Sequence, residues 1–255
     1  MRKVLVGSLS AILSCNLRKL DKKIFSHRFF KLSWTRNLSM SLIPFRSCLR
    51  QQKNLTICLP ALIDKCQRSS VVAVKVIRFH IKLVEVLLNA DPDLRVIHLV
   101  RDPRGMLQSW KEVSVPRLTN EGLRISANIA CQRMLADVVT RLRLETKFPG
   151  RIMLVRYEDL ARDSDLVLNE VYEKLLQQPV PVGVKRRVSG QINAAANDGR
   201  FNTKRKNGTA AAYSWKRKID RTFLEYVNTK CGEVLSLTRY NENWYNGNKD
   251  NSRKI

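Results

Sequence analysis

Residues 94–109 read LRVIHLVRDPRGMLQS, and this stretch decides which fold we expect. Its first seven residues, LRVIHLV, are dominated by leucine and β-branched side chains, which is typical of a buried strand. Asp102 then suits a helix N-cap and Pro103 suits the first helical position, so a helix is predicted to begin directly after the strand. Arg101 therefore stands between the carboxyl end of a strand and the start of a helix.

The segments on either side continue the alternation of strands and helices. Residues 71–77 (VVAVKVI) and 151–156 (RIMLVR) are predicted to be two further strands. Apolar residues at helical spacing predict helices over 81–89, 125–144 and 158–176. Strands and helices in this order predict an α/β fold, in which helices cover both faces of a parallel sheet.

Arg101 has the chemistry and the position of an anion-binding residue. Ligands of open parallel sheets bind beyond the carboxyl ends of the strands. The free N–H groups of a helix N-terminus favour an anion there, and a guanidinium adds a forked donor that suits phosphate. Ser109 follows Asp102 by seven residues and returns to the same helix face. Spacing alone leaves two interpretations open: a phosphate site, or an Arg101–Asp102 ion pair beside a surface serine.

The net charge indicates an anionic ligand or partner. Lys and Arg total 47 against 22 Asp and Glu, a formal balance of +25. Nucleic acid, acidic lipid, acidic sugar polymers and nucleotide phosphates all fit such a charge. The basic residues gather over residues 1–53 and again over 185–221. Because the chain has no nucleic-acid reader motif and no basic stretch interleaved with aromatics, we expect no nucleic-acid partner.

Residues 1–53 are predicted to be a basic leader or an atypical N-terminal segment, since they show no convincing pair of secondary elements. The apolar run VLVGSLSAIL behind Arg2 and Lys3 is similar to the start of a signal peptide. It is too short to span a bilayer, but it could associate with a membrane. The folded domain is expected over 54–245, followed by a polar tail over 246–255.

The cysteines and sequons bear on the cellular compartment. No pair of the six cysteines has zinc-site spacing, so we expect no structural metal. Cys58 and Cys66 are close enough in sequence for a small disulfide loop, while buried free thiols fit the composition equally well. Sequons at Asn37, Asn54 and Asn207 permit a secretory-pathway protein.

The segment VIHLVRDPRGMLQS (96–109) closely resembles the 3′-phosphate-binding motif of the Golgi carbohydrate 6-O-sulfotransferases, which use 3′-phosphoadenylyl sulfate (PAPS) as donor. Three more segments resemble that family in the same order: CLPALIDKCQ (58–67) before the strand at 71–79, LVRYEDLARD (154–163) and FNTKRKNGTAAAYSWKRKI (201–219). The resemblance covers residues 55–245. It implies a P-loop-NTPase-like sulfotransferase fold, with a parallel sheet flanked by helices and an incomplete N-terminal part.

The resemblance also implies roles for single residues. The implied donor-binding residues are Arg101, Asp102, Pro103, Arg104, Ser109, Arg205 and Lys206. Arg101 and Ser109 match the pair that holds the 3′-phosphate of the donor, and Arg205 or Lys206 matches the basic residue of a later loop. Trp215 matches a loop residue that is either a core anchor or a ligand contact. Tyr157 and Glu158 are expected to pack against and cap the following helix.

By the same resemblance, Cys58 with Cys66 and Cys131 with Cys231 are expected to form disulfides. The implied location is the Golgi lumen or membrane, or the cytoplasm if residues 1–53 are not a targeting segment. The implied acceptor is a glycan of the glycoprotein or glycosaminoglycan type.

One part of the family pattern has no counterpart in the chain. The family binds the 5′-phosphosulfate of the donor with a Gly/Ser-rich loop, whose backbone N–H groups surround the anion. Upstream of Cys58 no such loop follows a strand, and Gly7 is the only glycine before Gly105. We therefore name no catalytic base, and we interpret His98, inside a predicted strand, as a core histidine with satisfied hydrogen bonds.

Two functions follow from these observations. The first is a carbohydrate sulfotransferase that transfers a sulfuryl group from PAPS to a sugar hydroxyl, at the 6-O position of N-acetylglucosamine or galactose. The alternative is a catalytically inactive, truncated sulfotransferase-like protein that binds a nucleotide or a glycan. A cytosolic sulfotransferase of phenols or steroids is a related interpretation, which the CLPALIDKC segment and the sequons disfavour.

Overall fold

A computed structural model describes residues 2–26, 42–77, 79–114, 119–195 and 204–241 of the chain. The sequon at Asn37 and the polar tail at 246–255 lie outside these ranges. The chain divides into an N-terminal unit, Met1–Ala90, and a C-terminal unit, Asp91–Ile255.

The N-terminal unit is built from short helices. Its α-helices are α1 (Arg2–Leu13), α2 (Lys22–Ser26), α4 (Leu42–Gln52), α5 (Leu55–Gln67) and α6 (Val84–Ala90). Phe25 and Phe45 meet edge to face in its core, with ring centroids 5.9 Å apart. Helices α1, α2 and α4 therefore occupy a region in which we had expected no convincing pair of secondary elements. The division into leader, domain and tail stays a prediction.

Two disulfides tie this unit together, and they correct the predicted pairing of Cys58 with Cys66. Cys15 is bonded to Cys66, and Cys48 is bonded to Cys58, each pair with its Cα atoms 5.7 Å apart. Cys58 and Cys66 both lie on helix α5. Eight residues of α-helix separate two Cα atoms by about 12 Å, too far for a disulfide. Helix formation thus forces each cysteine to find a partner on another segment.

The predicted strand at residues 71–77 is also wrong. The segment has no strand or helix, and the side chains of Val71, Val76 and Ile77 are exposed. A β-strand forms only where a neighbour accepts and donates its backbone hydrogen bonds. Among the described residues no strand pairs with this segment, so the β-branched composition alone does not produce one.

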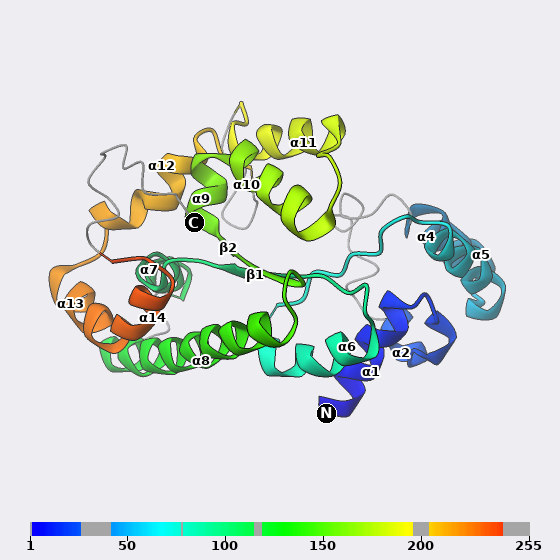
Figure 1. The fold of residues 1–255 in the computed structure, drawn as a ribbon, viewed down its shortest axis with the longest axis horizontal. Helices are drawn as coiled ribbons and strands as arrows, with labels where there is room; N and C mark the ends of the chain where they lie inside the picture. Colours follow the sequence, from blue (N-terminus) through cyan, green and yellow to red (C-terminus); the bar gives the residue numbers. More distant parts are fainter. Residues whose placement is uncertain (1, 27–41, 78, 115–118, 196–203, 242–255) are drawn as a thin grey trace. The chain divides into compact units, whose positions relative to one another are not determined.

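The C-terminal unit contains the predicted parallel sheet. Strand β1 (Val96–Val100) pairs in parallel with β2 (Ile152–Arg156), with Val96 opposite Ile152 and Val100 opposite Arg156. Helix α8 lies along one side of the strands, and α9 and α10 lie on the other (Figure 1). The helices of this unit are α7 (Pro103–Ser114), α8 (Asn120–Lys147), α9 (Tyr157–Arg162), α10 (Ser164–Glu170), α11 (Val182–Ile192), α12 (Gly208–Tyr213), α13 (Arg221–Lys230) and α14 (Gly232–Leu237). The expected sheet flanked by helices is confirmed.

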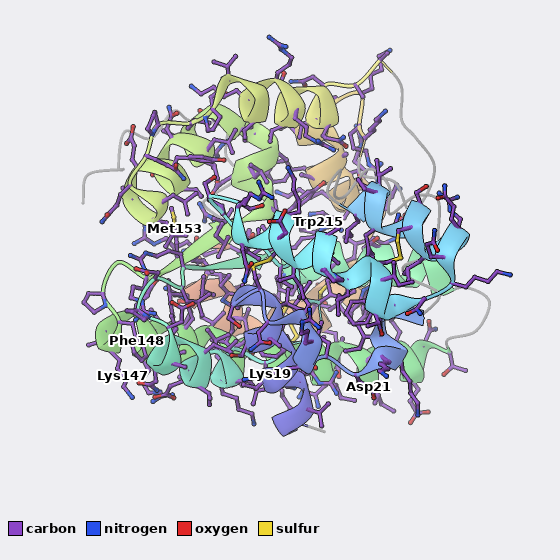
Figure 2. All side chains as sticks on the ribbon, turned by 90° about the vertical axis from the view of Figure 1, so that its right-hand side faces the viewer. Lys19, Asp21, Lys147, Phe148, Met153 and Trp215 are labelled. Atoms are coloured by element: carbon purple, nitrogen blue, oxygen red, sulfur yellow. A yellow bond between two sulfur atoms is a disulfide. The ribbon has the colours of Figure 1, made fainter. Side chains whose placement is uncertain are left out.

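Arg151 aligns the amino ends of the two strands. Its guanidinium donates to the backbone carbonyl of Leu94, with Nε 3.2 Å from the oxygen, and also to the carbonyl of Asp91. The guanidinium carbon of Arg151 also lies 5.4 Å from the ring centroid of Phe148. Figure 2 shows Phe148 beside Lys147, where α8 ends. These contacts set the register that brings Val100 and Arg156 to the same edge of the sheet.

The core of this unit lies between β1, α7, α8, α13 and α14. Its fully buried members include Leu107, Ala127 and Val227. The disulfide between Cys131 of α8 and Cys231, which follows α13, crosses the same core and confirms the predicted pair. No helix within the described residues is both long and apolar enough to cross a bilayer.

Candidate functional site: an anion site at the carboxyl end of β1

Strand β1 ends at Val100, and helix α7 begins three residues later at Pro103, as predicted. Asp102 caps the helix, because its Oδ1 accepts a hydrogen bond from the N–H of Arg104 at 2.9 Å. Pro103 is fully buried in the first turn, where its missing N–H costs no helical hydrogen bond. This local sequence therefore directs the N-terminus of α7 toward the carboxyl edge of the sheet.

Arg101, directly after β1, has a side-chain donor that no described residue accepts. Its side chain is half-buried, and its guanidinium carbon lies 5.1 Å from the ring centroid of Tyr157. Its Nε is buried and has no hydrogen-bond partner among the described residues. A buried charged donor without an acceptor is costly, and an anionic oxygen would satisfy it. The ion pair that we had considered between Arg101 and Asp102 does not form, since Asp102 pairs with Arg104.

Arg104, in contrast, uses its donors within the fold. Its Nε and Nη2 lie 3.0 and 2.8 Å from the carboxylate oxygens of Asp102. Nη2 also donates to the backbone carbonyl of Tyr240 at 2.6 Å, and the guanidinium stacks 5.1 Å from the ring centroid of Trp215. Trp215 is itself buried, and its indole Nε1 has no hydrogen-bond partner among the described residues, so the choice between core anchor and ligand contact stays a prediction. The donor contact predicted for Arg104 stays a prediction, while the structure gives it a supporting role.

Ser109 and the basic loop complete the predicted set. Ser109 lies half-buried on α7, two turns after Asp102. Arg205 is fixed by its backbone, whose N–H donates to Gln191 and whose carbonyl accepts from Ala194, both at 2.8 Å. Lys206 follows it and is exposed. Both precede helix α12, while residues 201–203 of the same loop lie outside the described ranges.

The helix that follows the basic loop, α12, is hydrogen-bonded to α9, the helix whose Tyr157 contacts Arg101. Thr209 of α12 donates to the carbonyl of Ala161 at 3.0 Å. Ala161 and Tyr157 are both on α9, four residues and about 6 Å apart along the helix axis. Thr209, three residues after Lys206, is thus anchored to α9, and Arg101 contacts the first residue of the same helix.

A further cation lies near Arg104. Burial, the positive charge of Arg104 and the carboxylate of Asp102 act on Lys216, and burial has the largest effect, lowering the pKa of Lys216 to about 8. Its Nζ lies 5.6 Å from the ring centroid of Trp215. An anion bound close by would favour the protonated amine and raise this pKa again.

Glu158 is buried, as packing against α9 requires, but its side chain does not form the N-cap hydrogen bond that we expected. Instead of capping α9, its fully buried carboxylate accepts from the backbone N–H of Asp102, with Oε1 3.1 Å from the nitrogen, and from the phenol of Tyr240. Burial raises the pKa of Glu158, and the hydrogen bond from Tyr240 opposes that shift. No local sequence signal connects residues 102, 158 and 240, so only the fold reveals this link.

His98 lies inside strand β1. Burial lowers the pKa of His98 to about 4, so its imidazole is neutral at physiological pH. Its Nδ1 is buried without a partner among the described residues, which corrects our view that its hydrogen bonds are satisfied. No cluster of His, Cys, Asp and Glu with the geometry of a metal site occurs in the described part of the chain.

Comparisons with known proteins identify the family to which the chain is similar. A family model described as the sulfotransferase family matches residues 23–177. Carbohydrate sulfotransferase 1 of Danio rerio is 31% identical over 211 residues, which cover 76% of this chain and 49% of that protein. Carbohydrate sulfotransferase 3 of Rattus norvegicus is 31% identical over 193 residues, covering 68% of this chain and 40% of that protein.

A third relative, carbohydrate sulfotransferase 5 of Mus musculus, is 26% identical over 197 residues, covering 69% of this chain and 50% of that protein. The chain thus spans about half the length of the curated relatives it matches. No solved structure matches the chain significantly.

Proposed function

The chain belongs to the sulfotransferase family, and from that premise we propose that it transfers a sulfuryl group from PAPS to a hydroxyl of a carbohydrate. The matched relatives are named as carbohydrate sulfotransferases, which supports a glycan acceptor. We propose the 6-O position of N-acetylglucosamine or galactose, on a glycoprotein or glycosaminoglycan, as the acceptor hydroxyl.

The observation that carries the proposal is the buried Nε of Arg101, which has no acceptor among the described residues. In our proposal the 3′-phosphate of the donor supplies that acceptor. The N–H groups of α7 and the hydroxyl of Ser109 add further donors, and Arg205 or Lys206 adds a second positive charge. The cation–π contact with the ring of Tyr157 restrains the guanidinium of Arg101 before the nucleotide arrives.

The transfer itself needs the donor to be held in line with the acceptor. The sugar oxygen attacks the donor sulfur, the bond from sulfur to the bridging phosphate oxygen breaks, and adenosine 3′,5′-bisphosphate leaves with the bonding pair. The proton of the sugar hydroxyl passes to a base, which we do not assign. Tight binding of the 3′-phosphate contributes to this step by orientation, because it fixes the nucleotide at its far end.

The alternative function, binding of a nucleotide or glycan without transfer, is favoured by one observation. The sequence upstream of Cys58 has no Gly/Ser-rich loop of the kind that binds the 5′-phosphosulfate. Without those backbone donors, little would stabilise the negative charge that develops on the leaving phosphate.

The proposed location is the Golgi, with the described units in the lumen. All six cysteines are in disulfides, which persist in the oxidising secretory pathway and are rare in the cytosol. Membrane association through the N-terminal segment remains part of this proposal.

The test is transfer of radiolabelled sulfate from PAPS to a panel of N-acetylglucosamine- and galactose-terminated acceptors. We expect labelled product with the wild-type chain and about a tenfold or greater loss with Arg101→Ala. Binding of adenosine 3′,5′-bisphosphate without transfer to any acceptor would support the alternative. Absence of both transfer and binding would contradict both functions.

A further inference from the structure

Four buried residues form a closed ring of hydrogen bonds next to Arg101. The N–H of Asp102 donates to Glu158, and the phenol of Tyr240 donates to the same carboxylate. The backbone carbonyl of Tyr240 accepts from Arg104, whose guanidinium returns to the carboxylate of Asp102. We call these residues, Asp102, Glu158, Tyr240 and Arg104, the buried ring.

The buried ring joins three parts of the C-terminal unit that are far apart in sequence. Asp102 and Arg104 follow β1, Glu158 follows β2, and Tyr240 lies after α14. All four side chains are buried: the exposed fraction is 4% for Asp102, 8% for Arg104, 0% for Glu158 and 1% for Tyr240. Hydrogen bonds shielded from water in this way are strong and directional, and a broken bond leaves a buried polar atom without a partner. The ring therefore holds the carboxyl ends of both strands in one arrangement.

This arrangement reaches Arg101 through a single peptide plane. The N–H of Asp102 and the C=O of Arg101 belong to the same planar peptide group. A hydrogen bond from that N–H to Glu158 consequently fixes the orientation of the plane from which the Arg101 side chain departs. The neighbour of Glu158 in sequence, Tyr157, supports the other end of the side chain by contacting the guanidinium.

We propose that Glu158 and Tyr240 are positioning residues for nucleotide binding, which act by fixing the peptide plane between Arg101 and Asp102. Neither residue touches the nucleotide in this proposal. It rests on the proposed function, because it takes the 3′-phosphate as the group that Arg101 binds. A ring that only stabilised the fold would leave the preference for a 3′-phosphate unchanged in a folded variant.

The test compares two nucleotides that differ in that phosphate. The affinities of the full chain for adenosine 3′,5′-bisphosphate and for adenosine 5′-monophosphate are measured by calorimetry, below the unfolding temperature of each variant. Their ratio is the preference for the 3′-phosphate. Tyr240→Phe removes one hydroxyl from the ring, and we expect it to lower the ratio about tenfold.

Tyr226→Phe is the matched control. It removes a tyrosine hydroxyl that donates to the carbonyl of Arg124, at 3.2 Å, outside the ring. We expect this variant to keep the wild-type ratio. If Tyr226→Phe and Tyr240→Phe lowered the ratio equally, the effect would be a general one and the proposal would be wrong.

Glu158 provides a second, independent pair of variants. In Glu158→Gln the amide oxygen can still accept from Asp102 and the amide nitrogen can donate to the phenol oxygen, so we expect the ratio to stay within about threefold of wild type. Glu158→Ala removes both contacts and should lower the ratio about tenfold or more. If Tyr240→Phe does not fold, the comparison of Glu158→Gln with Glu158→Ala tests the positioning role instead.

Arg101→Ala separates failure of this inference from failure of the proposed function. If the wild type shows no preference and Arg101→Ala binds both nucleotides equally well, the proposed function is wrong. If Arg101→Ala loses the preference while folded Tyr240→Phe and Glu158→Ala keep it, only the positioning role is overturned.

Discussion

Gly105 lies directly against the indole of Trp215. A methyl group at position 105 would meet Cδ1 of Trp215 at 2.7 Å and Nε1 at 3.0 Å, closer than side-chain atoms normally approach. The indole is buried and also stacks on Arg104, so it has little room to move. The first turn of α7 and the segment carrying Trp215 therefore pack in contact, and glycine at position 105 permits it.

Gly105→Ala should consequently destabilise the fold, even though alanine favours a helix. We expect a loss of about 1–3 kcal/mol in the free energy of unfolding, the usual cost of overpacking a core. The measurement is chemical denaturation monitored by circular dichroism. The indole must shift to accept the methyl group, and its shift would disturb the stacking on Arg104.

Gly190→Ala is the control for helix propensity. Gly190 is inside helix α11, and a methyl group there would meet nothing within 4 Å. Alanine should stabilise this position by up to about 1 kcal/mol. Equal effects of the two substitutions would show that Gly105 is not packed against Trp215.

The disulfide between Cys131 and Cys231 should contribute more to stability than the one between Cys48 and Cys58. The sequence separations are 100 and 10 residues, and a longer closed loop restricts the unfolded chain more. On chain entropy alone the difference is about 2 kcal/mol. We expect the double variant Cys131→Ala with Cys231→Ala to lose correspondingly more unfolding free energy than Cys48→Ala with Cys58→Ala. A smaller loss for the longer loop would contradict this account.

Glu158 should make stability fall as the pH rises. Burial raises its pKa above the ordinary value of 4.5, so the folded state binds the proton more tightly than the unfolded state. The stabilisation is complete below pH 4.5 and is lost as the pH rises through the raised pKa of the folded state. Asp102 adds to the shift by its charge, and the hydrogen bond from Tyr240 reduces it.

Glu158→Gln cannot titrate, and it isolates this effect from the other carboxylates. Unfolding free energies of the wild type and the variant are measured by urea denaturation at a series of pH values from acid to neutral. The advantage of the wild type over the variant should shrink as the pH rises. Parallel curves would mean that the pKa of Glu158 is the same in the folded and unfolded states.

The strand, the helix start and the position of Arg101 between them were predictable because their signals are local. A run of β-branched residues, a capping Asp102 and Pro103 specify the end of β1 and the start of α7 within a few residues. The same kind of local signal failed at residues 71–77, since a strand also needs a partner that the composition does not supply.

The cysteine pairing and the buried ring were not predicted from the sequence, because both depend on contacts between residues that are far apart in it. The pairing of Cys58 with Cys66 failed because both residues lie on one helix, where they cannot reach each other. The buried ring joins residues separated by 56, 82 and 136 positions. Only folding brings these polar groups together, so Glu158 was interpreted from its neighbours in sequence rather than from its partners in space.

The most direct measurement is the affinity of the full chain for adenosine 3′,5′-bisphosphate, compared between wild type, Arg101→Ala and Arg133→Ala. Arg133 is an exposed arginine of α8 and controls for the loss of one positive charge. Loss of a charge-assisted bond to phosphate should weaken binding by Arg101→Ala about 10- to 100-fold, while Arg133→Ala binds as the wild type does. If Arg101→Ala binds the nucleotide as tightly as the wild type, Arg101 does not hold its phosphate and the account is wrong.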